Sequence, residues 1–213
     1  MSQNVAIVDY GMGNLRSVQN AVVSVANAAD KIVLSNDPEQ LRQADRIIFP
    51  GQGAAKDCMH ALRQTGMQQV VLELAKSKPF LGICMGLQVL MSHSDENGGT
   101  DCISLYPGRV RHFSDVHKPD SSLKIPHMGW NNVRQTRAHP MWKNITDESM
   151  FYFVHSYFVQ PEKSALTIAE STYGIDFTAA IAVDNIFAMQ CHPEKSAASG
   201  LQLLRNFLQW DGD

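Results

Sequence analysis

The sequence has little that would mark a secreted, membrane or metal-binding protein. Its 213 residues include four cysteines, and no two of them form a CxxC pair, so the ligand spacing of a structural zinc site is missing. No apolar run reaches the roughly 18 residues that a membrane span needs. The N-terminal MSQNVAIVDY lacks a basic stretch followed by a long apolar core, so we do not expect a signal peptide. We expect a protein of the reducing cytoplasm, with no metal site.

The chain also lacks a large excess of positive or of negative charge. The formal net charge is −3 and no basic stripe appears, so nucleic acid is not expected as a partner. Apolar residues make up 44% of the chain, which is enough to bury a substantial core. No linker rich in proline, glycine or serine divides the sequence, and we therefore predict a single domain over residues 1–213.

Short apolar runs alternate with helical patterns in the first half of the chain. The predicted strands cover residues 4–10, 31–35, 46–50 and 79–84, and the predicted helices cover residues 14–26, 37–44, 54–64, 67–77 and 85–94. The second of these helices begins with Asp37 as N-cap and Pro38 at its first position. Strand and helix in alternation favour a parallel sheet covered on both faces.

The second half is richer in strand-like runs separated by turn residues. These runs cover residues 108–113, 124–133, 150–159, 165–171, 177–183 and 186–192, and an amphipathic helix follows at 199–210. We therefore predict an α/β fold, with a doubly wound, mostly parallel sheet to which antiparallel strands are added.

A cysteine stands where the strand 79–84 meets the next helix, in the sequence GICMG. The pattern fits a nucleophile elbow, in which Gly82 and Gly86 leave room for a sharp turn and Cys84 projects from its apex. The free N–H groups at the start of a helix can activate such a thiol. The N–H of Met85 then points to where an oxyanion would form. A buried cysteine that ends a strand is the alternative, because short motifs produce false positives.

A base for this thiol is available in the sequence QCHPEKS. His192 follows a strand-like run, and Glu194 stands two residues later, across Pro193. One loop can thus present the imidazole together with a carboxylate that holds its tautomer. His127 and His155 are other candidate bases, but neither has a carboxylate two residues away.

Cys191 is a rival nucleophile beside this base. It lacks flanking glycines, and its side chain should point to the opposite strand face from His192. We interpret Cys191 as a structural residue.

Two further glycine turns follow predicted strands. PGQG at 50–53 can supply a second backbone N–H to the oxyanion if its strand lies beside that of Cys84, although a plain strand-to-helix turn is the alternative. GMG at 11–13 suggests a dinucleotide site, but Arg16 stands where the fingerprint needs a third glycine. We therefore expect no cofactor.

Together, PGQGAA, GICMGLQ and QCHPEKS resemble the motifs of the class I (triad) glutamine amidotransferases, and the resemblance covers essentially the whole chain. It implies a flavodoxin-like core and an enzyme that hydrolyses L-glutamine to glutamate and ammonia. VDYGMGNLRSV, IPHMGWNNV and FYFVHSYFV are similar to one branch, the glutaminase subunits of imidazole glycerol phosphate synthase in histidine biosynthesis. The implied partner is a (β/α)₈ cyclase subunit, in a heterodimer, that uses the ammonia and a phosphoribulosyl nucleotide to make imidazole glycerol phosphate and an aminoimidazole carboxamide nucleotide. The branch also implies that hydrolysis is slow until the partner holds its ligand.

The same resemblance assigns roles to individual residues. The implied roles are Cys84 as nucleophile, His192 as acid and base, Glu194 as its orienter, Gly51 and Met85 as the oxyanion hole, Gln88, His155, Ser156 and Tyr157 as the glutamine pocket, and Asn14 and Trp130 as a surface that faces the partner. Gln52 departs from the family, which more often has an apolar residue there.

Two other functions stay open from the sequence. A different thiol hydrolase, such as a small peptidase, could use a similar elbow, although Gln88 and the VHSYF run argue against it. A non-catalytic binding subunit could keep the fold, although the intact set of Cys84, His192 and Glu194 argues against that.

Overall fold

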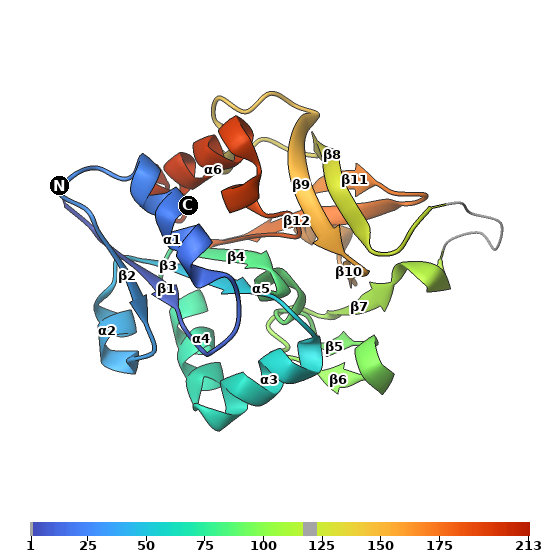
Figure 1. Ribbon diagram of the computed structural model, residues 1–213, viewed down its shortest axis with the longest axis horizontal. Coiled ribbons are helices and arrows are strands. Elements are labelled where there is room, and N and C mark those ends of the chain that lie inside the picture. Colours follow the sequence, from blue (N-terminus) through green and yellow to red (C-terminus); the bar gives the residue numbers. More distant parts are fainter. Residues whose placement is uncertain (1, 117–122) are drawn as a thin grey trace.

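The computed structural model describes residues 2–116 and 123–213 (Figure 1). Its centre is a run of parallel strands in the order β2-β1-β3-β4-β13. Their bounds are β1 Asn4–Val8, β2 Lys31–Ser35, β3 Arg46–Gly51, β4 Phe80–Cys84 and β13 Ile186–Met189. Every residue of β4 and β13 is buried, as expected for parallel strands that are covered on both faces.

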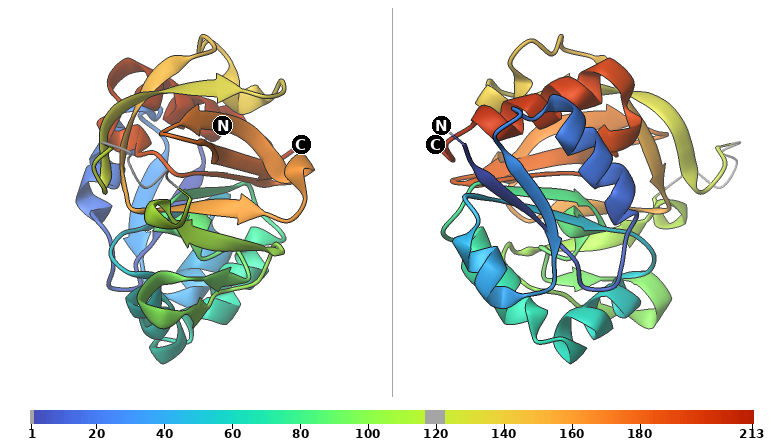
Figure 2. Two further views of the ribbon diagram at one scale, coloured as in Figure 1. Left: turned by 90° about the vertical axis from the view of Figure 1, so that its right-hand side faces the viewer. Right: turned by 60° about the vertical axis from the view of Figure 1, so that its left-hand side comes forward.

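Helices cover both faces of these strands (Figure 2). One face carries α1 (Leu15–Val25) and α6 (Ala197–Gln209), which lie side by side, and the other carries α2 (Pro38–Gln43), α3 (Ala55–Gln64) and α4 (Met67–Ala75). Each helix buries an apolar stripe, as α1 does with Val18 and Val22. The N-cap of α2 is Asp37, as predicted, and its Oδ1 accepts a hydrogen bond of 2.9 Å from the N–H of Glu39.

Antiparallel strands from the second half of the chain extend the sheet. Beyond β13 the order continues β12-β10-β7-β5-β6, with β11 and then β8 and β9 attached at the side of β12. Their bounds are β5 His93–Ser94, β6 Thr100–Asp101, β7 Gly108–His112, β8 His127–Gln135, β9 Ser149–His155, β10 Tyr157–Pro161, β11 Thr167–Thr172 and β12 Asp176–Val183. Short 3₁₀ helices lie at Glu96–Gly98, Phe113–Asp115, Pro140–Trp142, Ser164–Leu166 and Pro193–Lys195. The predicted fold class is confirmed.

The apolar core has two clusters, one on each side of the parallel strands. One joins α1 and α6 to β9, through residues such as Val22, Phe207 and Phe151. The other fills the space under α2, α3 and α4. Cys84 belongs to the first cluster and Met85 to the second, so the turn after β4 passes from one side of the sheet to the other.

The helix predicted at 85–94 is wrong in length, because α5 ends after one turn, Met85–Gln88. The carbonyls of Val89 and Leu90 accept hydrogen bonds from the N–H groups of residues 103, 105 and 106. These acceptors are therefore taken by a loop farther along the chain, and the helix cannot continue. β5 begins at His93, inside the predicted helix.

The single strand predicted at 150–159 is also wrong, since β9 and β10 are separate strands that break at Ser156. β9 pairs with β8, whereas β10 pairs with β7 and β12. The carbonyl of Ser156 accepts a hydrogen bond of 3.1 Å from the N–H of Phe113. Both strands are apolar, so the sequence pattern does not reveal the break.

The single domain over residues 1–213 stays a prediction. No helix within the described residues is both long enough and apolar enough to cross a membrane.

Candidate active site

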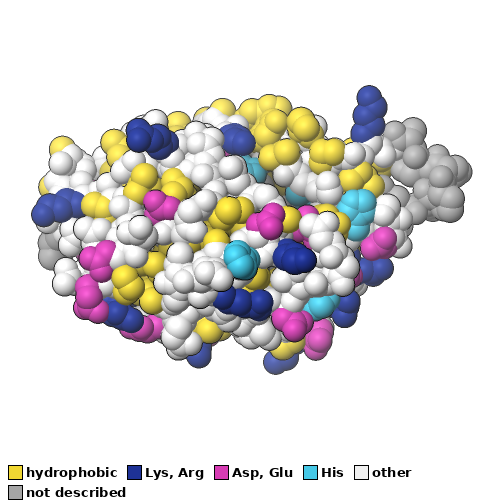
Figure 3. Space-filling model, turned by 60° about the horizontal axis from the view of Figure 1, so that its bottom comes forward, with side chains coloured by type: hydrophobic (Ala, Val, Ile, Leu, Met, Phe, Trp, Pro, Cys, Tyr) yellow, Lys and Arg dark blue, Asp and Glu magenta, His cyan; other side chains and the backbone are white. Residues whose placement is uncertain are grey.

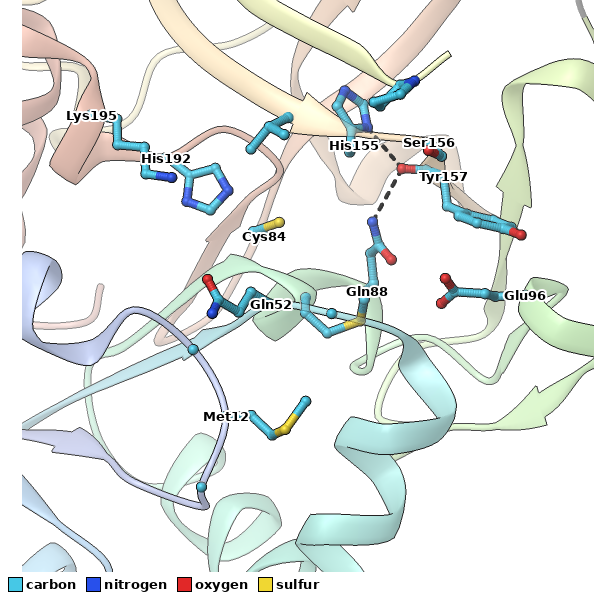
Figure 4. A pocket seen from close by; sticks show the side chains of 16 residues that line it. Met12, Gln52, Cys84, Gln88, Glu96, His155, Ser156, Tyr157, His192 and Lys195 are labelled. Carbon is cyan, nitrogen blue, oxygen red and sulfur yellow. Dashed lines mark hydrogen bonds between the residues drawn. The ribbon is translucent and has the colours of Figure 1, made fainter.

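The strand order brings two distant segments together at one edge of the sheet. β4 and β13 are parallel neighbours, with Ile83 aligned to Met189. This aligned pair lies one residue before Cys84, which ends β4, and three residues before His192, so the carboxyl ends of the two strands lie side by side. Cys84 and His192 line the same cavity (Figure 4). Parallel pairing of β4 with β13 thus brings Cys84 and His192 close together, although they are far apart in the sequence.

The turn at Cys84 has the backbone of a nucleophile elbow. Cys84 has φ 55° and ψ −108°, a strained conformation for a residue with a side chain. Its neighbours must be small: a Cβ on Gly86 would lie 1.9 Å from the carbonyl oxygen of Phe49, and one on Gly82 would lie 2.8 Å from Cβ of Ala188. The sharp turn is possible because both glycines let other chain segments approach closely.

His192 is held by the loop that follows β13. Its Nδ1 lies 2.8 Å from Oε1 of Glu194, and both side chains are almost fully buried. Its N–H donates to the carbonyl of Tyr152, and its own carbonyl accepts from the hydroxyl of Ser196 at 2.6 Å. Nδ1 faces the carboxylate, so Nε2 is left for the sulfur of Cys84.

Electrostatics favour the charged form of this imidazole. Burial lowers the pKa of His192, but the Cys84 thiolate and the Glu194 carboxylate outweigh burial and raise the pKa from 6.5 to about 10. An imidazolium held between a thiolate and a carboxylate can deliver a proton to a leaving group.

A second close backbone approach supports the His192 loop. A Cβ on Gly200, in α6, would lie 1.9 Å from the carbonyl oxygen of Pro193. The helix therefore packs directly on the backbone of the loop that carries His192.

The rival residues are differently placed. Cys191 is fully buried, and burial raises its thiol pKa well above the ordinary value, so it stays a neutral thiol. His127 Nδ1 lies 2.9 Å from His155 Nε2, and burial lowers the pKa of His127 to about 4 and that of His155 to about 3. This buried pair of neutral rings is suited to structure rather than to proton transfer at neutral pH.

The two predicted oxyanion donors belong to the backbone next to Cys84. Gly51 ends β3 and is aligned with Cys84 on β4, so the strand of the PGQG turn lies where the sequence prediction needed it. Pro50 is aligned with Ile83 and has no N–H of its own, so it is the N–H of Gly51 that donates to the carbonyl of Ile83 in this pairing. Met85 is the first residue of α5. The roles of the two N–H groups in an oxyanion hole stay predictions. Gln52 is exposed and lines the cavity, where its side chain lies near Cys84 and His192 (Figure 4).

The cavity has a volume of about 690 Å³ and holds the predicted pocket residues (Figure 4). Its lining includes Gly11, Met12, Gly13, Gln52, Gly53, Cys84, Met85, Gln88, Glu96, Val154, His155, Ser156, Tyr157, His192 and Lys195. Gln88 donates from Nε2 to the carbonyl of Tyr157 at 3.1 Å and to Oε1 of Gln190 at 3.0 Å. Its Oε1 is buried and has no hydrogen-bond partner among the described residues, so it is free to accept from a ligand.

Sequence reasoning missed several residues of this site. Gln190 is completely buried and donates from Nε2 to Sγ of Cys84 across 3.6 Å. Ser196 fixes the His192 loop, and Lys195 lies beside His192 in the cavity. A signal for Gln190 was present, because it stands two residues before His192 on a strand-like run and should share its face.

The two predicted interface residues lie at the surface. Asn14 is exposed at the start of α1, directly after the cavity-lining Gly13. Trp130 on β8 is 48% exposed, and Met128 and Met150 beside it are 62% and 43% exposed. A tryptophan and two methionines on one hairpin form an unusual amount of exposed apolar surface.

Other features of the surface are less specific. On the face in Figure 3, positive and negative side chains lie among one another, so no continuous basic track crosses it. In residues 2–116 and 123–213, no group of three His, Cys, Asp or Glu side chains is placed to hold a metal ion. The absence of a metal and of a cofactor stays a prediction.

Comparisons with known sequences agree along the whole chain. The profile of the family Glutamine amidotransferase class-I matches residues 6–210. The chain is 54% identical over 208 residues to the imidazole glycerol phosphate synthase subunit HisH of Hydrogenovibrio crunogenus, covering 98% of this chain and 97% of that protein. It is 50% identical over 211 residues to the protein of the same name from Pseudomonas putida, covering 99% of each.

Solved structures share the fold at low sequence identity. A structure of PurLQS from Thermotoga maritima matches with a TM-score of 0.73 and 16% identity, covering 98% of this chain and 99% of that one. A crystal structure of a glutamine amidotransferase matches with a TM-score of 0.69 and 15% identity, covering 96% of this chain and 97% of that one. These matches support the fold, and the sequence matches support the predicted family. The chain belongs to the class-I glutamine amidotransferases.

Proposed function

We propose that this chain hydrolyses L-glutamine at Cys84, as the glutaminase subunit of an imidazole glycerol phosphate synthase. One observation carries the catalytic part: Cys84 at a strained elbow and His192, which is bonded to the buried Glu194, line one cavity at the shared edge of β4 and β13. Relatives that share 54% and 50% sequence identity with this chain over nearly its full length carry the name of that synthase subunit, which supports the choice of branch.

The first half of the reaction forms a thioester. The Cys84 thiolate attacks the side-chain amide carbon of glutamine, a C–S bond forms, and the carbonyl oxygen becomes an oxyanion. The proposed donors to that charge are the N–H of Met85 and the N–H of Gly51, which must first leave the carbonyl of Ile83. The His192 imidazolium gives its proton to the amide nitrogen, the C–N bond breaks, and ammonia leaves.

The second half releases glutamate. Neutral His192 takes a proton from water, and the hydroxide attacks the thioester carbon. The C–S bond breaks and returns the thiolate, with His192 again protonated. Glu194 keeps Nδ1 of His192 occupied during both halves, so the same ring nitrogen serves as acid and then as base.

The glutamine pocket is formed by the cavity wall beyond Cys84. Oε1 of Gln88 can accept a hydrogen bond from the α-ammonium group of glutamine, because it is buried and otherwise unpartnered in the described part of the chain. Backbone groups of His155, Ser156 and Tyr157 line the same wall. Gln88 stands one helical turn after Cys84, which fits the length of a glutamine side chain.

Ammonia from this site needs an acceptor on another chain. Free ammonia is protonated in water near neutral pH and then loses its nucleophilicity, so transfer through a protein contact is more efficient. The proposed partner is a (β/α)₈ cyclase subunit in a heterodimer in the cytoplasm, and it would use the ammonia to make imidazole glycerol phosphate. Its docking surface would include Asn14, which follows the cavity-lining Gly13, and the exposed Trp130. As in the branch it resembles, we expect hydrolysis to be slow until the partner holds its nucleotide ligand.

The test is a glutaminase assay on the reconstituted complex, with and without the nucleotide ligand of the cyclase. Cys84→Ala should abolish glutamate release, whereas Cys102→Ala, at another buried cysteine, should keep it. A glutamine-mimicking electrophile should label Cys84 alone. Turnover retained by Cys84→Ala, or labelling elsewhere, would reject the proposed site and favour another thiol hydrolase. A complex that forms but never hydrolyses glutamine would point to a non-catalytic subunit.

A further inference from the structure

The β8–β9 hairpin carries a line of hydrogen bonds that ends at the wall of the cavity. His127 and His155 are aligned across the two strands, and His127 Nδ1 lies 2.9 Å from His155 Nε2. His155 Nδ1 lies 2.8 Å from the carbonyl oxygen of Tyr157, which lines the cavity. At the other end of the line, Asn131 Nδ2 lies 3.3 Å from His127 Nε2. None of these side-chain groups has a role in the reaction proposed above.

The carbonyl at one end fixes the direction of the whole line. A carbonyl oxygen can only accept, so in a neutral ring Nδ1 of His155 must carry the proton, and its Nε2 is an acceptor. That acceptor requires a proton on Nδ1 of His127, which leaves Nε2 of His127 to accept from the amide of Asn131. Every donor in the line therefore points the same way, from Asn131 toward Tyr157.

Burial keeps both rings neutral, as this direction requires. His127 is 3% exposed and His155 is 6% exposed, and burial lowers their pKa values to about 4 and about 3. The ring of His127 also stacks on those of Phe153 and Tyr173, with centroid distances of 5.0 and 4.1 Å. The stacked rings hold the plane of the imidazole, so its nitrogens are aimed along the line of hydrogen bonds.

The last acceptor of the line also holds the proposed substrate residue Gln88. The carbonyl oxygen of Tyr157 accepts from Nδ1 of His155 and, at 3.1 Å, from Nε2 of Gln88 (Figure 4). Gln88 donates its second N–H to Oε1 of Gln190. Both N–H groups of the Gln88 amide are thus used, and its remaining polar atom is Oε1, the oxygen proposed to bind the ammonium group of glutamine. The direction of that oxygen depends on where the Tyr157 carbonyl is held.

We infer that His155 is a positioning residue for Gln88: it holds the Tyr157 carbonyl so that the Gln88 amide presents its oxygen to the ammonium group of glutamine. His127 and Asn131 set the tautomer that this role requires. The inference rests on the proposed glutaminase function and deepens it. Tyr157 and His127 use both ring nitrogens of His155, so the ring has no polar atom left for the ligand and acts on binding through Gln88.

The test asks whether His155 acts through Gln88. In the complex with the cyclase and its nucleotide ligand, kcat and KM for glutamine are measured for His155→Leu, for Gln88→Leu and for the double variant. His155→Asn tests rescue, because an asparagine amide places an N–H near the position of Nδ1. His139→Leu is the matched control, since burial also lowers the pKa of His139 to about 4, but its ring packs against Phe187 and Trp210.

We expect His155→Leu to raise KM roughly three- to tenfold and to leave kcat within about twofold of the wild-type value, because the lost hydrogen bond positions the substrate and touches no reacting atom. His155→Asn should bring KM back to within about twofold of the wild type. His139→Leu should change neither constant. In the Gln88→Leu background, His155→Leu should raise KM by less than about twofold, since the two substitutions then remove the same interaction.

A second measurement needs no variant. When only this chain of the complex is labelled with 15N-histidine, two-bond 1H–15N spectra report which ring nitrogen carries the proton, and the rings are assigned through their backbone resonances. His127 and His155 should both carry it on Nδ1 at pH 7.5.

Three results would overturn the inference. A proton on Nε2 of His155 in the wild-type protein would reject it, even if the variants do not fold. A KM of His155→Leu equal to that of His139→Leu would reject it as well. Full multiplication of the effects of His155→Leu and Gln88→Leu on KM would show that His155 acts by another route. A wild-type complex that does not hydrolyse glutamine would instead reject the proposed function, and the proton positions, which are measured without turnover, distinguish the two failures.

Discussion

Gln190 donates its side-chain amide to the sulfur of Cys84, across 3.6 Å from Nε2 to Sγ. Its Oε1 accepts from Nε2 of Gln88 at 3.0 Å, and Gln88 also donates to the carbonyl of Tyr157. One buried amide thus links the proposed nucleophile to the proposed substrate pocket.

Replacement of Gln190 by leucine should weaken the substrate pocket. The lost acceptor for Gln88 should raise KM for glutamine by roughly three- to tenfold, as expected for one hydrogen bond. The measurement is steady-state kinetics of glutamate release. Gln202→Leu, on α6, is the matched control. A KM in Gln190→Leu equal to that of the control would show that this hydrogen bond does not position Gln88 for the substrate.

Removal of the sulfur should lower the pKa of His192. Burial disfavours the imidazolium, and the largest of the contributions that favour it comes from Cys84, so the pKa of His192 should be lower in Cys84→Ala than in the wild type. The pKa of His192 is above 6.5 in the folded protein, so its contribution to stability is full below pH 6.5 and is lost as the pH rises through about 10. That loss should be smaller in Cys84→Ala. The test is an NMR titration of His192 in both proteins, with Cys102→Ala as the control, and an unchanged titration would contradict the coupling.

The buried His127–His155 pair should make the protein less stable in mild acid. Burial lowers the two pKa values to about 4 and about 3, below the ordinary 6.5, so the unfolded chain binds more protons than the folded one under pH 6.5. The free energy of unfolding should therefore fall as the pH drops from 6.5 toward 4, by up to about 1.4 kcal/mol per pH unit for each histidine.

Urea unfolding across this range would measure the slope. His127→Gln removes one titrating ring and keeps an amide that can hydrogen-bond to His155, so its slope should be clearly smaller than that of the wild type. At pH 7.5, where both rings are neutral in either state, the two proteins should show no such difference in slope. Equal slopes below pH 6.5 would argue against the pair as the source.

Replacement of Trp130 should weaken the complex and leave the fold of this chain intact. A half-exposed tryptophan between two exposed methionines is typical of a binding hot spot, so Trp130→Ala should raise Kd for the cyclase by roughly ten- to a hundredfold. The melting temperature of the isolated chain should change little, because the side chain is 48% exposed. Val23→Ala, at an exposed valine on α1, is the control. Equal Kd values for both variants would place the interface elsewhere.

The sequence predicted the parallel half of the fold well, because its signals are local. The alternation of apolar runs with helical patterns, and caps such as Asp37, mark β1 to β4 and α1 to α4 within a residue or two. The same signals fail after Gln88, where the chain is buried on all sides and helix and strand look alike. There the carbonyls of Val89 and Leu90 bond to a distant loop, and no local pattern reports that.

The candidate site was predictable where chemistry dictates residue type. A thiol at an elbow needs glycines, and a base needs an orienter, so Cys84, His192 and Glu194 can be read from spacing. Gln190 is marked only by its place two residues before His192, and Ser196 could not be found in this way. Both act through contacts that the fold creates, and each has an ordinary buried role that fits the sequence equally well.

Gly86 and Gly200 are positions at which the site tolerates no larger side chain. Gly86 brings the helix that follows Cys84 into direct backbone contact with Phe49 of β3, and Gly200 brings α6 into direct backbone contact with Pro193 in the loop of His192. The positions of the sulfur and of the imidazole therefore depend on main chain packed against main chain, which has no rotamers with which to adjust. In a pool of genes randomised at these two codons, selection for growth without histidine should return glycine at both, while exposed positions of α6 drift freely.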